Sequence, residues 1–118
     1  MNQGFSVVRA QAQPVNRLDL QAQLLELGLI RYTPAGQTAL DFSLKHESQV
    51  IEAGRPRKVS LEIKGVAIGE ICKRVQALGV GGSALFSGFL AAMRNGRGVI
   101  FHLTELTPSP VPDGSNPD

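Results

Sequence analysis

The chain has 118 residues, 42% hydrophobic and 19% charged, a composition typical of one globular domain rather than a disordered segment. Its single cysteine, Cys72, excludes an internal disulfide and a cysteine-rich metal site. The net charge is +2, but two of the 10 acids are Asp113 and Asp118, so residues 1–107 hold 12 Lys and Arg against 8 acids, or +4. This mild basicity is compatible with a polyanionic partner.

Residues 1–15 are polar and rich in glutamine, and we expect them to form a loosely ordered N-terminal extension. They lack the apolar core of a secretory signal. No apolar run in the chain approaches the roughly 20 residues that a membrane span needs. We therefore expect a cytoplasmic protein without membrane contact.

Residues 16–48 predict two long strands joined by a tight turn. Apolar side chains occupy even positions from Leu18 to Leu24 and odd positions from Leu25 to Leu29, and such a slip in alternation is typical of a β-bulge. Pro34-Ala35-Gly36 supplies the turn. In the second strand, apolar side chains again alternate with polar ones, at Leu40, Phe42 and Leu44.

The rest of the chain predicts a connection, a strand, a helix and a hairpin. Residues 47–58 lack clean alternation and read as a connection, while residues 58–64 alternate and predict a third strand. Residues 67–78 have helical spacing and are followed by Gly79 as a C-cap; their apolar side chains are Ile68, Ile71, Cys72, Val75 and Leu78.

Residues 83–93 predict a fourth strand with a bend or bulge at Gly88, and residues 99–106 a fifth, joined by an Asn-Gly turn. From Thr107 the chain has four prolines, and we expect a mobile tail over residues 108–118 that cannot pair into a sheet. The domain is therefore expected over residues 16–107.

This order of elements predicts an all-β fold: a five-stranded OB-fold barrel with one short helix between the third and fourth strands. OB barrels bind oligonucleotides on the face of strands two and three and in the neighbouring loops. The same fold hosts other ligands, so topology alone leaves the function open.

The sequence contains no arrangement of residues that indicates an enzyme, a cofactor or a metal site. His46 and Glu47 are adjacent on a strand and would point to opposite faces. His102 reads as an outward sheet residue, opposite in phase to Phe101. Residues 79–83, GVGGS, lack the lysine and the helix of a phosphate-binding loop.

Single-strand binders combine cations for phosphates with aromatic faces for bases. The cations that could converge on one face of a barrel are Arg31, Lys45, Arg55, Arg57, Lys58, Lys64, Arg94 and Arg97. Tyr32 could stack on a base or plug the mouth of the barrel. Phe42, Phe89 and Phe101 are interpreted as core residues, and Phe86 is left open. With few exposed aromatics, we expect weak, salt-dependent binding with a log–log salt slope of roughly −3, from about four phosphate contacts.

Three segments, NRL from Asn16, IRYTPAG from Ile30 and LDFSLKHES from Leu40, resemble the OB-fold of bacterial single-stranded-DNA-binding proteins. The chain is most similar to their relatives in the PriB family, primosomal replication protein N. The resemblance is strongest over residues 16–48 and extends more loosely over residues 58–106.

This resemblance implies a non-catalytic homodimer that binds single-stranded DNA and assists a PriA-type helicase and other primosome proteins in replication restart. Pairing of the first strands of two barrels, as in the family, implies a dimer interface at Asn16, Arg17, Leu18, Asp19, Leu20 and Gln21. With the tyrosine noted above, the DNA-binding residues are then expected at Arg31, Tyr32, Lys45, Arg57, Lys58, Arg94 and Arg97.

The chain departs from its relatives at Ser60, where they often place an aromatic, and at Glu47, where they can be basic. It also has two arginines between the last two strands, where relatives may carry several lysines. Two alternatives therefore stay open: a general single-stranded-DNA-binding protein, and an OB adaptor that binds proteins and has little affinity for DNA.

Overall fold

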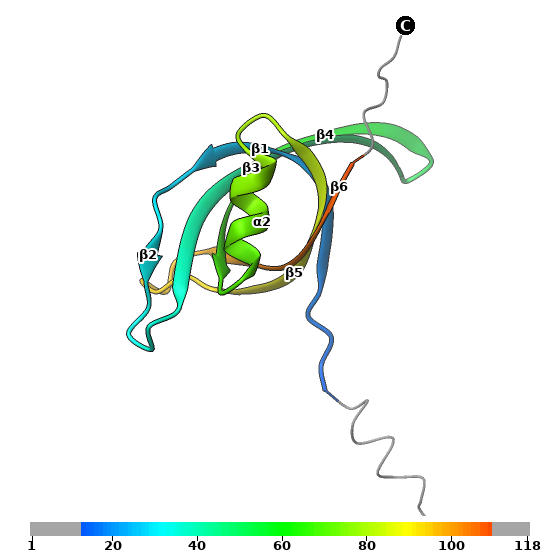
Figure 1. Ribbon diagram of the computed structural model, residues 1–118. Helices are drawn as coiled ribbons and strands as arrows, with labels where there is room; N and C mark the ends of the chain where they lie inside the picture. The colour runs from blue at the N-terminus through cyan, green and yellow to red at the C-terminus, as the bar shows by residue number, and fades with distance from the viewer. Residues whose placement is uncertain (1–12, 110–118) are drawn as a thin grey trace, which may run out of the picture.

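The computed structural model describes residues 13–109, and they form a β-barrel with one helix across one end (Figure 1). The elements are β1 (Leu18–Leu27), β2 (Arg31–Tyr32), β3 (Thr38–Glu52), β4 (Arg55–Ile68), α2 (Ile71–Leu78), β5 (Ser83–Ala92) and β6 (Val99–Pro108). The strand order is β1-β5-β6-β4-β3-β2, and an additional pairing of β1 with β3 closes the barrel. Since β2 is a two-residue edge, five long strands make the wall, which confirms the predicted OB-fold.

The first strand serves two neighbours because it bends. Its first half, Leu18–Gln23, pairs with β5, and its second half pairs with β3. The register of the β1–β3 ladder shifts between Leu24 and Glu26, which confirms the predicted bulge. The expected apolar role of Leu29 is wrong: β1 ends at Leu27, and Leu29 is 89% exposed.

Alternating side chains of the strands fill the barrel, and α2 closes its end with Cys72 and Val75. Phe42 and Phe101 are buried as expected, and Phe86 is fully buried. Phe89, also expected in the core, is 38% exposed. Residues 86 and 89 are an odd number of positions apart on one strand, so their side chains point to opposite faces and only one can enter the core.

The helix is shorter than predicted. Ala67 and Ile68 belong to β4, and Gly69, with a φ of 89°, separates that strand from α2. Ile68 is 40% exposed at the end of β4, so its spacing of three from Ile71 does not mark a shared buried helix face. The predicted C-cap is confirmed, since the Gly79 N–H donates to the Val75 carbonyl at 3.1 Å.

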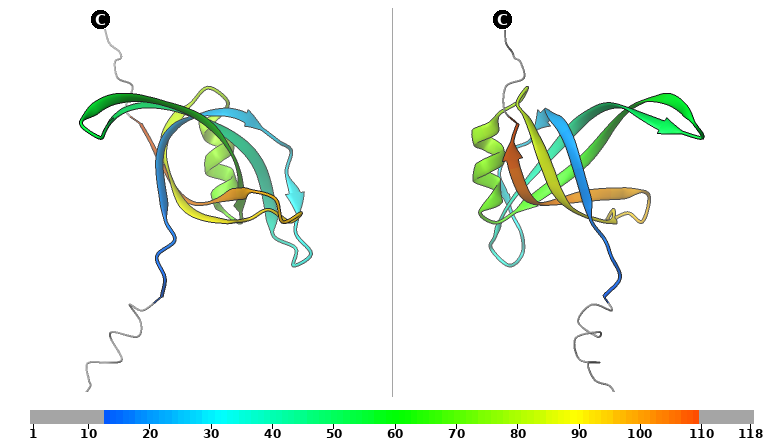
Figure 2. Two further views of the ribbon diagram at one scale, coloured as in Figure 1. Left: turned by 180° about the vertical axis from the view of Figure 1, so that it is seen from behind. Right: turned by 90° about the vertical axis from the view of Figure 1, so that its right-hand side faces the viewer.

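The hairpin of β3 and β4 is much longer than the sequence indicated. Every residue from Ala39 to Glu52 has a partner in β4, so the predicted connection over residues 47–58 is wrong. The loop is only Ala53-Gly54, both with positive φ, the geometry of a type I′ turn. β3 pairs with β1 only up to Lys45, and beyond it β3 and β4 continue as a two-stranded hairpin that extends past the barrel (Figures 1 and 2). We call residues 47–60 the projecting ribbon.

The last strand also runs past its predicted end. Thr107 and Pro108 pair with Leu85 and Ala84, and the Ser109 N–H donates to the Ser83 carbonyl at 3.1 Å. The expectation that the tail leaves the sheet at residue 107 is therefore wrong by two residues, because a proline can still end a strand. Most of the predicted extension and tail, residues 1–12 and 110–118, lies outside the described residues. No helix within residues 13–109 is long and apolar enough to cross a membrane.

Candidate nucleic-acid interface

The outer surface of β3, β4, β6 and β5 is one continuous face, which we call the outer face. Successive partners in its ladders form a row across the four strands: Asp41, Val66, His102 and Phe89. The next row includes Ser43 and its partner Lys64. Between the two rows, the side chains of Phe42 and Phe101 point into the barrel, where both are buried.

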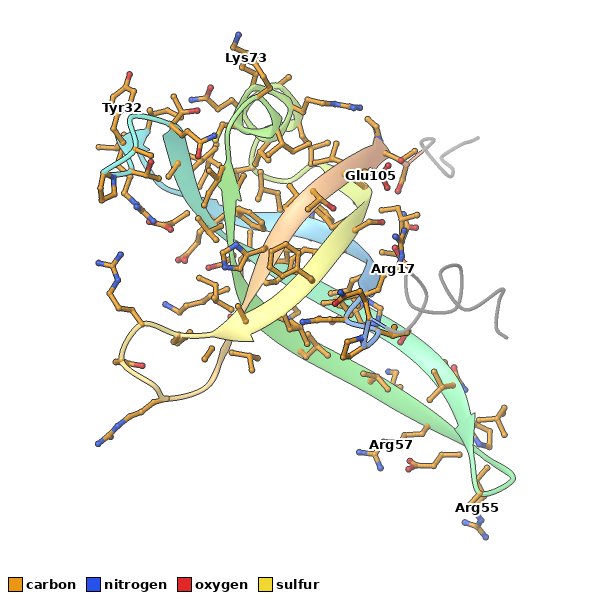
Figure 3. The ribbon with its side chains drawn as sticks, turned by 90° about the horizontal axis from the view of Figure 1, so that it is seen from below. Arg17, Tyr32, Arg55, Arg57, Lys73 and Glu105 are labelled. Carbon is orange, nitrogen blue, oxygen red and sulfur yellow. The ribbon has the colours of Figure 1, made fainter. Side chains whose placement is uncertain are left out.

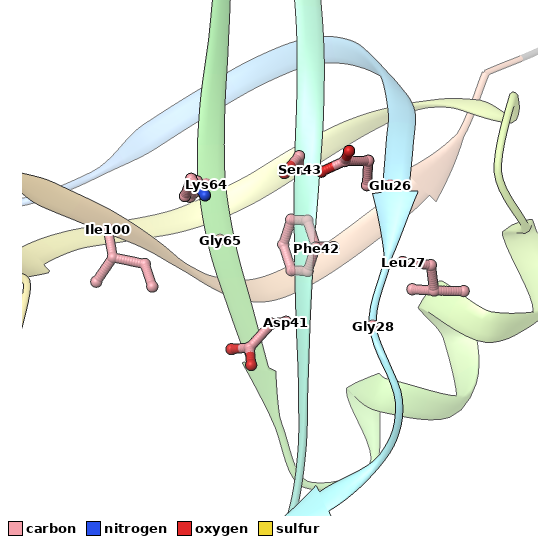
Figure 4. A pocket seen from close by; sticks show the side chains of 9 residues that line it. All are labelled: Glu26, Leu27, Gly28, Asp41, Phe42, Ser43, Lys64, Gly65 and Ile100. Carbon is pink, nitrogen blue, oxygen red and sulfur yellow. Dashed lines mark hydrogen bonds between the residues drawn. The ribbon is translucent and has the colours of Figure 1, made fainter.

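A hollow of about 650 Å³ opens on this face (Figure 4). It is lined by Glu26, Leu27, Gly28, Asp41, Phe42, Ser43, Lys64, Gly65 and Ile100. A Cβ at Gly65 would lie 2.5 Å from the ring of Phe42, so this glycine lets the ring reach the wall. The hollow therefore combines an apolar floor with one lysine and the carboxylates of Glu26 and Asp41.

Arg31 lies at the β2 edge of the outer face, but its charge is paired. Its Nε and Nη2 donate to the two carboxylate oxygens of Asp41, each at 3.0 Å. These hydrogen bonds lower the pKa of the Asp41 carboxyl below its usual range. A phosphate would have to compete with this carboxylate for Arg31.

The neighbouring Tyr32 is 70% exposed and pairs through its backbone with Thr38. Of the two interpretations of this side chain, exposure favours an accessible ring over a plug in the barrel mouth.

The predicted lysines lie on the outer face, but one predicted arginine does not. Lys45 lies opposite Glu62, with Glu47 at 3.9 Å, and Lys58 lies farther out on the same face, opposite Gln49. Within residues 13–109, neither Lys58 nor Lys64 has a carboxylate within 4.0 Å.

Arg57 is next to Lys58 on the strand and therefore points to the other side of the ribbon. There it lies opposite Val50 and forms an ion pair with Glu52 at 3.2 Å. Figure 3 shows Arg55 and Arg57 near the tip of the hairpin, far from Tyr32. The structure thus brings the predicted cations together only in part.

The loop between β5 and β6 presents Arg94 and Arg97 to solvent. The Gly96 N–H donates to the Met93 carbonyl at 2.8 Å, and the Asn95 side-chain oxygen accepts from the Arg97 N–H at 2.8 Å. In the described part of the chain, neither guanidinium has an acidic partner within 4.0 Å. These two charges are thus available to a phosphate.

The residues predicted at a dimer interface are Asn16 and Arg17, just before β1, and Leu18 to Gln21 in its first half. The side-chain amide of Asn16 both donates to and accepts from the Leu90 backbone, at 2.8 and 2.9 Å. Arg17 pairs with Asp19 at 2.9 Å. The pKa of the Asp19 carboxyl is lowered, mainly by its hydrogen bond to Arg17 and next by one to Ser87. On the side away from β5, the Gln21 carbonyl lies 2.6 Å from Nδ1 of His46.

Residues Leu18–Ala22 pair with β5 along one edge of β1. Within residues 13–109, no strand pairs with them along the opposite edge.

Sequence reasoning missed one aromatic element of the outer face. Phe89 and His102 are direct partners on β5 and β6, and their rings stack with centroids 4.8 Å apart and planes within 8°. The sequence did contain a signal for it: Phe86 and Phe89 are three positions apart, so on one strand they point to opposite faces.

Comparison with known proteins agrees with this fold. A family model described as "Another single-strand binding protein family" matches residues 16–105. The single-stranded DNA binding protein of Thermus aquaticus has a TM-score of 0.66 at 20% identity, over 84% of this chain and 52% of that one, which supports the fold alone. The chain is thus an OB-fold member of a single-strand binding protein family.

More similar relatives narrow this class. The replication restart protein PriB of Bordetella pertussis is 45% identical over 80 residues, 68% of this chain and 75% of that protein. PriB of Nitrosomonas europaea is 33% identical over 76 residues, 64% of this chain and 70% of that one. The PriB structure from Ralstonia solanacearum has a TM-score of 0.74 at 32% identity, over 80% of this chain and 98% of that one.

The chain belongs to the PriB family.

Proposed function

We propose that this protein binds single-stranded DNA on its outer face and serves, without catalysis, as an accessory protein in replication restart in the cytoplasm. The observation that carries the proposal is its 45% identity to a replication restart protein PriB. The arginines of the β5–β6 loop, which have no acidic partner within residues 13–109, lie next to an OB-fold face and supply the chemistry that such binding needs.

Binding would depend on a small number of cations. Among the cations on or beside the outer face, Lys58, Lys64, Arg94 and Arg97 have no carboxylate of residues 13–109 within 4.0 Å, and Lys45 is only loosely paired. Each contact between a cation and a phosphate of a single strand contributes about −0.7 to the log–log salt slope. Four such contacts give a slope of roughly −3 and little sequence preference.

The test is a fluorescence-anisotropy titration of labelled oligo-dT at low and moderate salt, with a duplex of the same length for comparison. We expect salt-sensitive preference for the single strand, and weaker binding by Arg94→Ala/Arg97→Ala with a slope less steep by about 1.4. The matched control is Lys73→Ala/Arg74→Ala, which removes the same charge from α2. Absence of binding at low salt would refute the DNA-binding role.

We also propose that the unpaired edge of β1 forms a homodimer by pairing with its copy. In an antiparallel strand, the N–H and C=O of one residue point to the same side, so the Asp19 N–H is expected to face this edge, as the Gln21 carbonyl does. Asp19→Pro would remove that donor and leave the donors to β5 in place. Light scattering should then report a monomer, while Asp19→Ala, which removes only the carboxylate, stays dimeric.

An adaptor role is the second candidate, and the partial dispersion of the cations favours it. The projecting ribbon exposes Val50 and Ile51, and Leu61 is exposed at its base; these side chains could contact a PriA-type helicase or another primosome protein. If oligo-dT does not bind, pull-down with that helicase, comparing the unmodified chain with Ile51→Ser, decides whether the protein acts through protein contacts.

A further inference from the structure

The pair of Phe89 and His102 is an aromatic surface that the barrel interior does not use. The Phe89 side chain is 38% exposed and His102 is half-buried. Their stacking, with centroids 4.8 Å apart, spans two neighbouring strands and holds both rings upright on the sheet. A rigid aromatic pair with open surface is suited to stacking against another flat ring.

The backbone fixes this pair in place. A Cβ at Gly88 would lie 1.8 Å from the carbonyl oxygen of His102, so only glycine allows β5 and β6 to approach this closely. The β5–β6 register shifts between Ser87 and Gly88, immediately before Phe89. The position of the rings is therefore set by the strands and not by a mobile loop.

The charged groups around the Phe89–His102 pair indicate what kind of ligand could supply a ring that stacks on it. Arg94 and Arg97 lie in the loop between β5 and β6, each five residues along the chain from Phe89 and His102 respectively, so their Cα atoms are at most about 17 Å from those of the pair. His102 also lies in register with Val66, in the row that begins at Asp41. The aromatic pair is thus continuous with the outer face and close to two guanidinium groups that have no carboxylate of residues 13–109 within 4.0 Å.

We propose that an unstacked nucleobase of single-stranded DNA stacks on the Phe89–His102 pair while Arg94 and Arg97 hold neighbouring phosphates. This inference rests on the proposed function and extends the DNA site beyond the β3–β4 face to β5 and β6. Stacking on one base is worth about 1–3 kcal/mol, which is about five- to 150-fold in affinity.

The test compares a short oligo-dT with an abasic oligonucleotide that has the same number of phosphates. The proteins are the unmodified chain, Phe89→Leu, which keeps apolar bulk but removes the ring, and the control Leu85→Ala. Leu85 lies on the same strand and is 36% exposed. We expect Phe89→Leu to lose about fivefold or more on oligo-dT and nothing on the abasic strand, and Leu85→Ala to lose nothing on either.

Equal losses on both oligonucleotides, or no loss, would overturn stacking while leaving DNA binding intact. If the unmodified chain does not bind oligo-dT, the proposed function fails and stacking fails with it. A second measurement does not depend on the folding of a variant: photocrosslinking of the unmodified chain to an oligonucleotide containing 5-iododeoxyuridine. Crosslinks to peptides that contain Phe89 or His102 support the proposal, and crosslinks confined to other peptides contradict it.

Discussion

The two halves of the β3–β4 ladder differ in whether their apolar side chains are buried against another part of the barrel. Near the barrel, Leu40, Phe42 and Leu44 are buried against the opposite wall. In the projecting ribbon the same ladder continues, but Val50 is 43% exposed and Ile51 is 70% exposed. Backbone pairing therefore persists where burial stops, and apolar alternation reports burial rather than the strand itself.

The largest expected effect of this difference is on stability. Leu44→Ala should lower the free energy of unfolding by about 2–5 kcal/mol, because the side chain is fully buried and leaves a cavity. Val50→Ala in the ribbon should cost less than about 1 kcal/mol. Chemical denaturation of the two variants measures both values. Similar costs would show that the ribbon is also packed, for example against a second copy of the chain.

The two faces of the ribbon should differ in DNA binding. Lys58→Ala should weaken oligo-dT binding by a few-fold and reduce the magnitude of the salt slope by about 0.7, because it removes one phosphate contact from the outer face. Arg57→Ala is the neighbouring control, since Arg57 points to the other side and pairs with Glu52. Anisotropy titrations over several salt concentrations measure the slopes, and an equal change in both would place DNA on both faces of the ribbon.

The turn at the end of the ribbon contains a residue whose replacement should stabilise the fold. Ala53 has a φ of 53°, a left-handed conformation that costs an ordinary L-residue about 1–2 kcal/mol. Asparagine visits this conformation more readily, so Ala53→Asn should raise the free energy of unfolding by about 0.5–1 kcal/mol. Denaturation measures the gain, and Ala35→Asn in the turn between β2 and β3 is the control. No gain from Ala53→Asn would indicate that the ribbon unfolds separately from the barrel.

The smallest effect concerns the ion pair of Arg31 and Asp41. Because the folded-state pKa of Asp41 is lowered, the pair stabilises the fold above the ordinary pKa of about 3.9, and this contribution is lost as pH falls through the lowered value. The Asp41 side chain is 56% exposed, so we expect less than about 1 kcal/mol.

Denaturation of the unmodified chain and of Asp41→Asn at pH 6 and pH 3 measures this contribution as a difference. The two proteins should differ at pH 6 and converge at pH 3. If the difference in the free energy of unfolding between the two proteins persists at pH 3, Asp41 stabilises the fold by something other than its charge.

The DNA-binding and dimer residues remain predictions, but the structure shows why some could be grouped from sequence and others not. Arg94 and Arg97 flank an Asn-Gly turn, and a turn of this kind exposes its charges in any fold. Arg57 and Lys58 looked like one cluster because the segment read as a loop. Once it is a strand, consecutive residues face opposite ways and the cluster divides.

The sequence by itself determined the number and order of the barrel strands, the bulge in β1, the break at Gly88 and the C-cap at Gly79, because each has a local signal in spacing or glycine chemistry. Only the tertiary structure decided the length of the hairpin, the pairing of Arg31 with Asp41 and the outward stack of Phe89 on His102. These features depend on which strand lies beside which, and cross-strand partners far apart in the chain leave no periodic trace in the sequence.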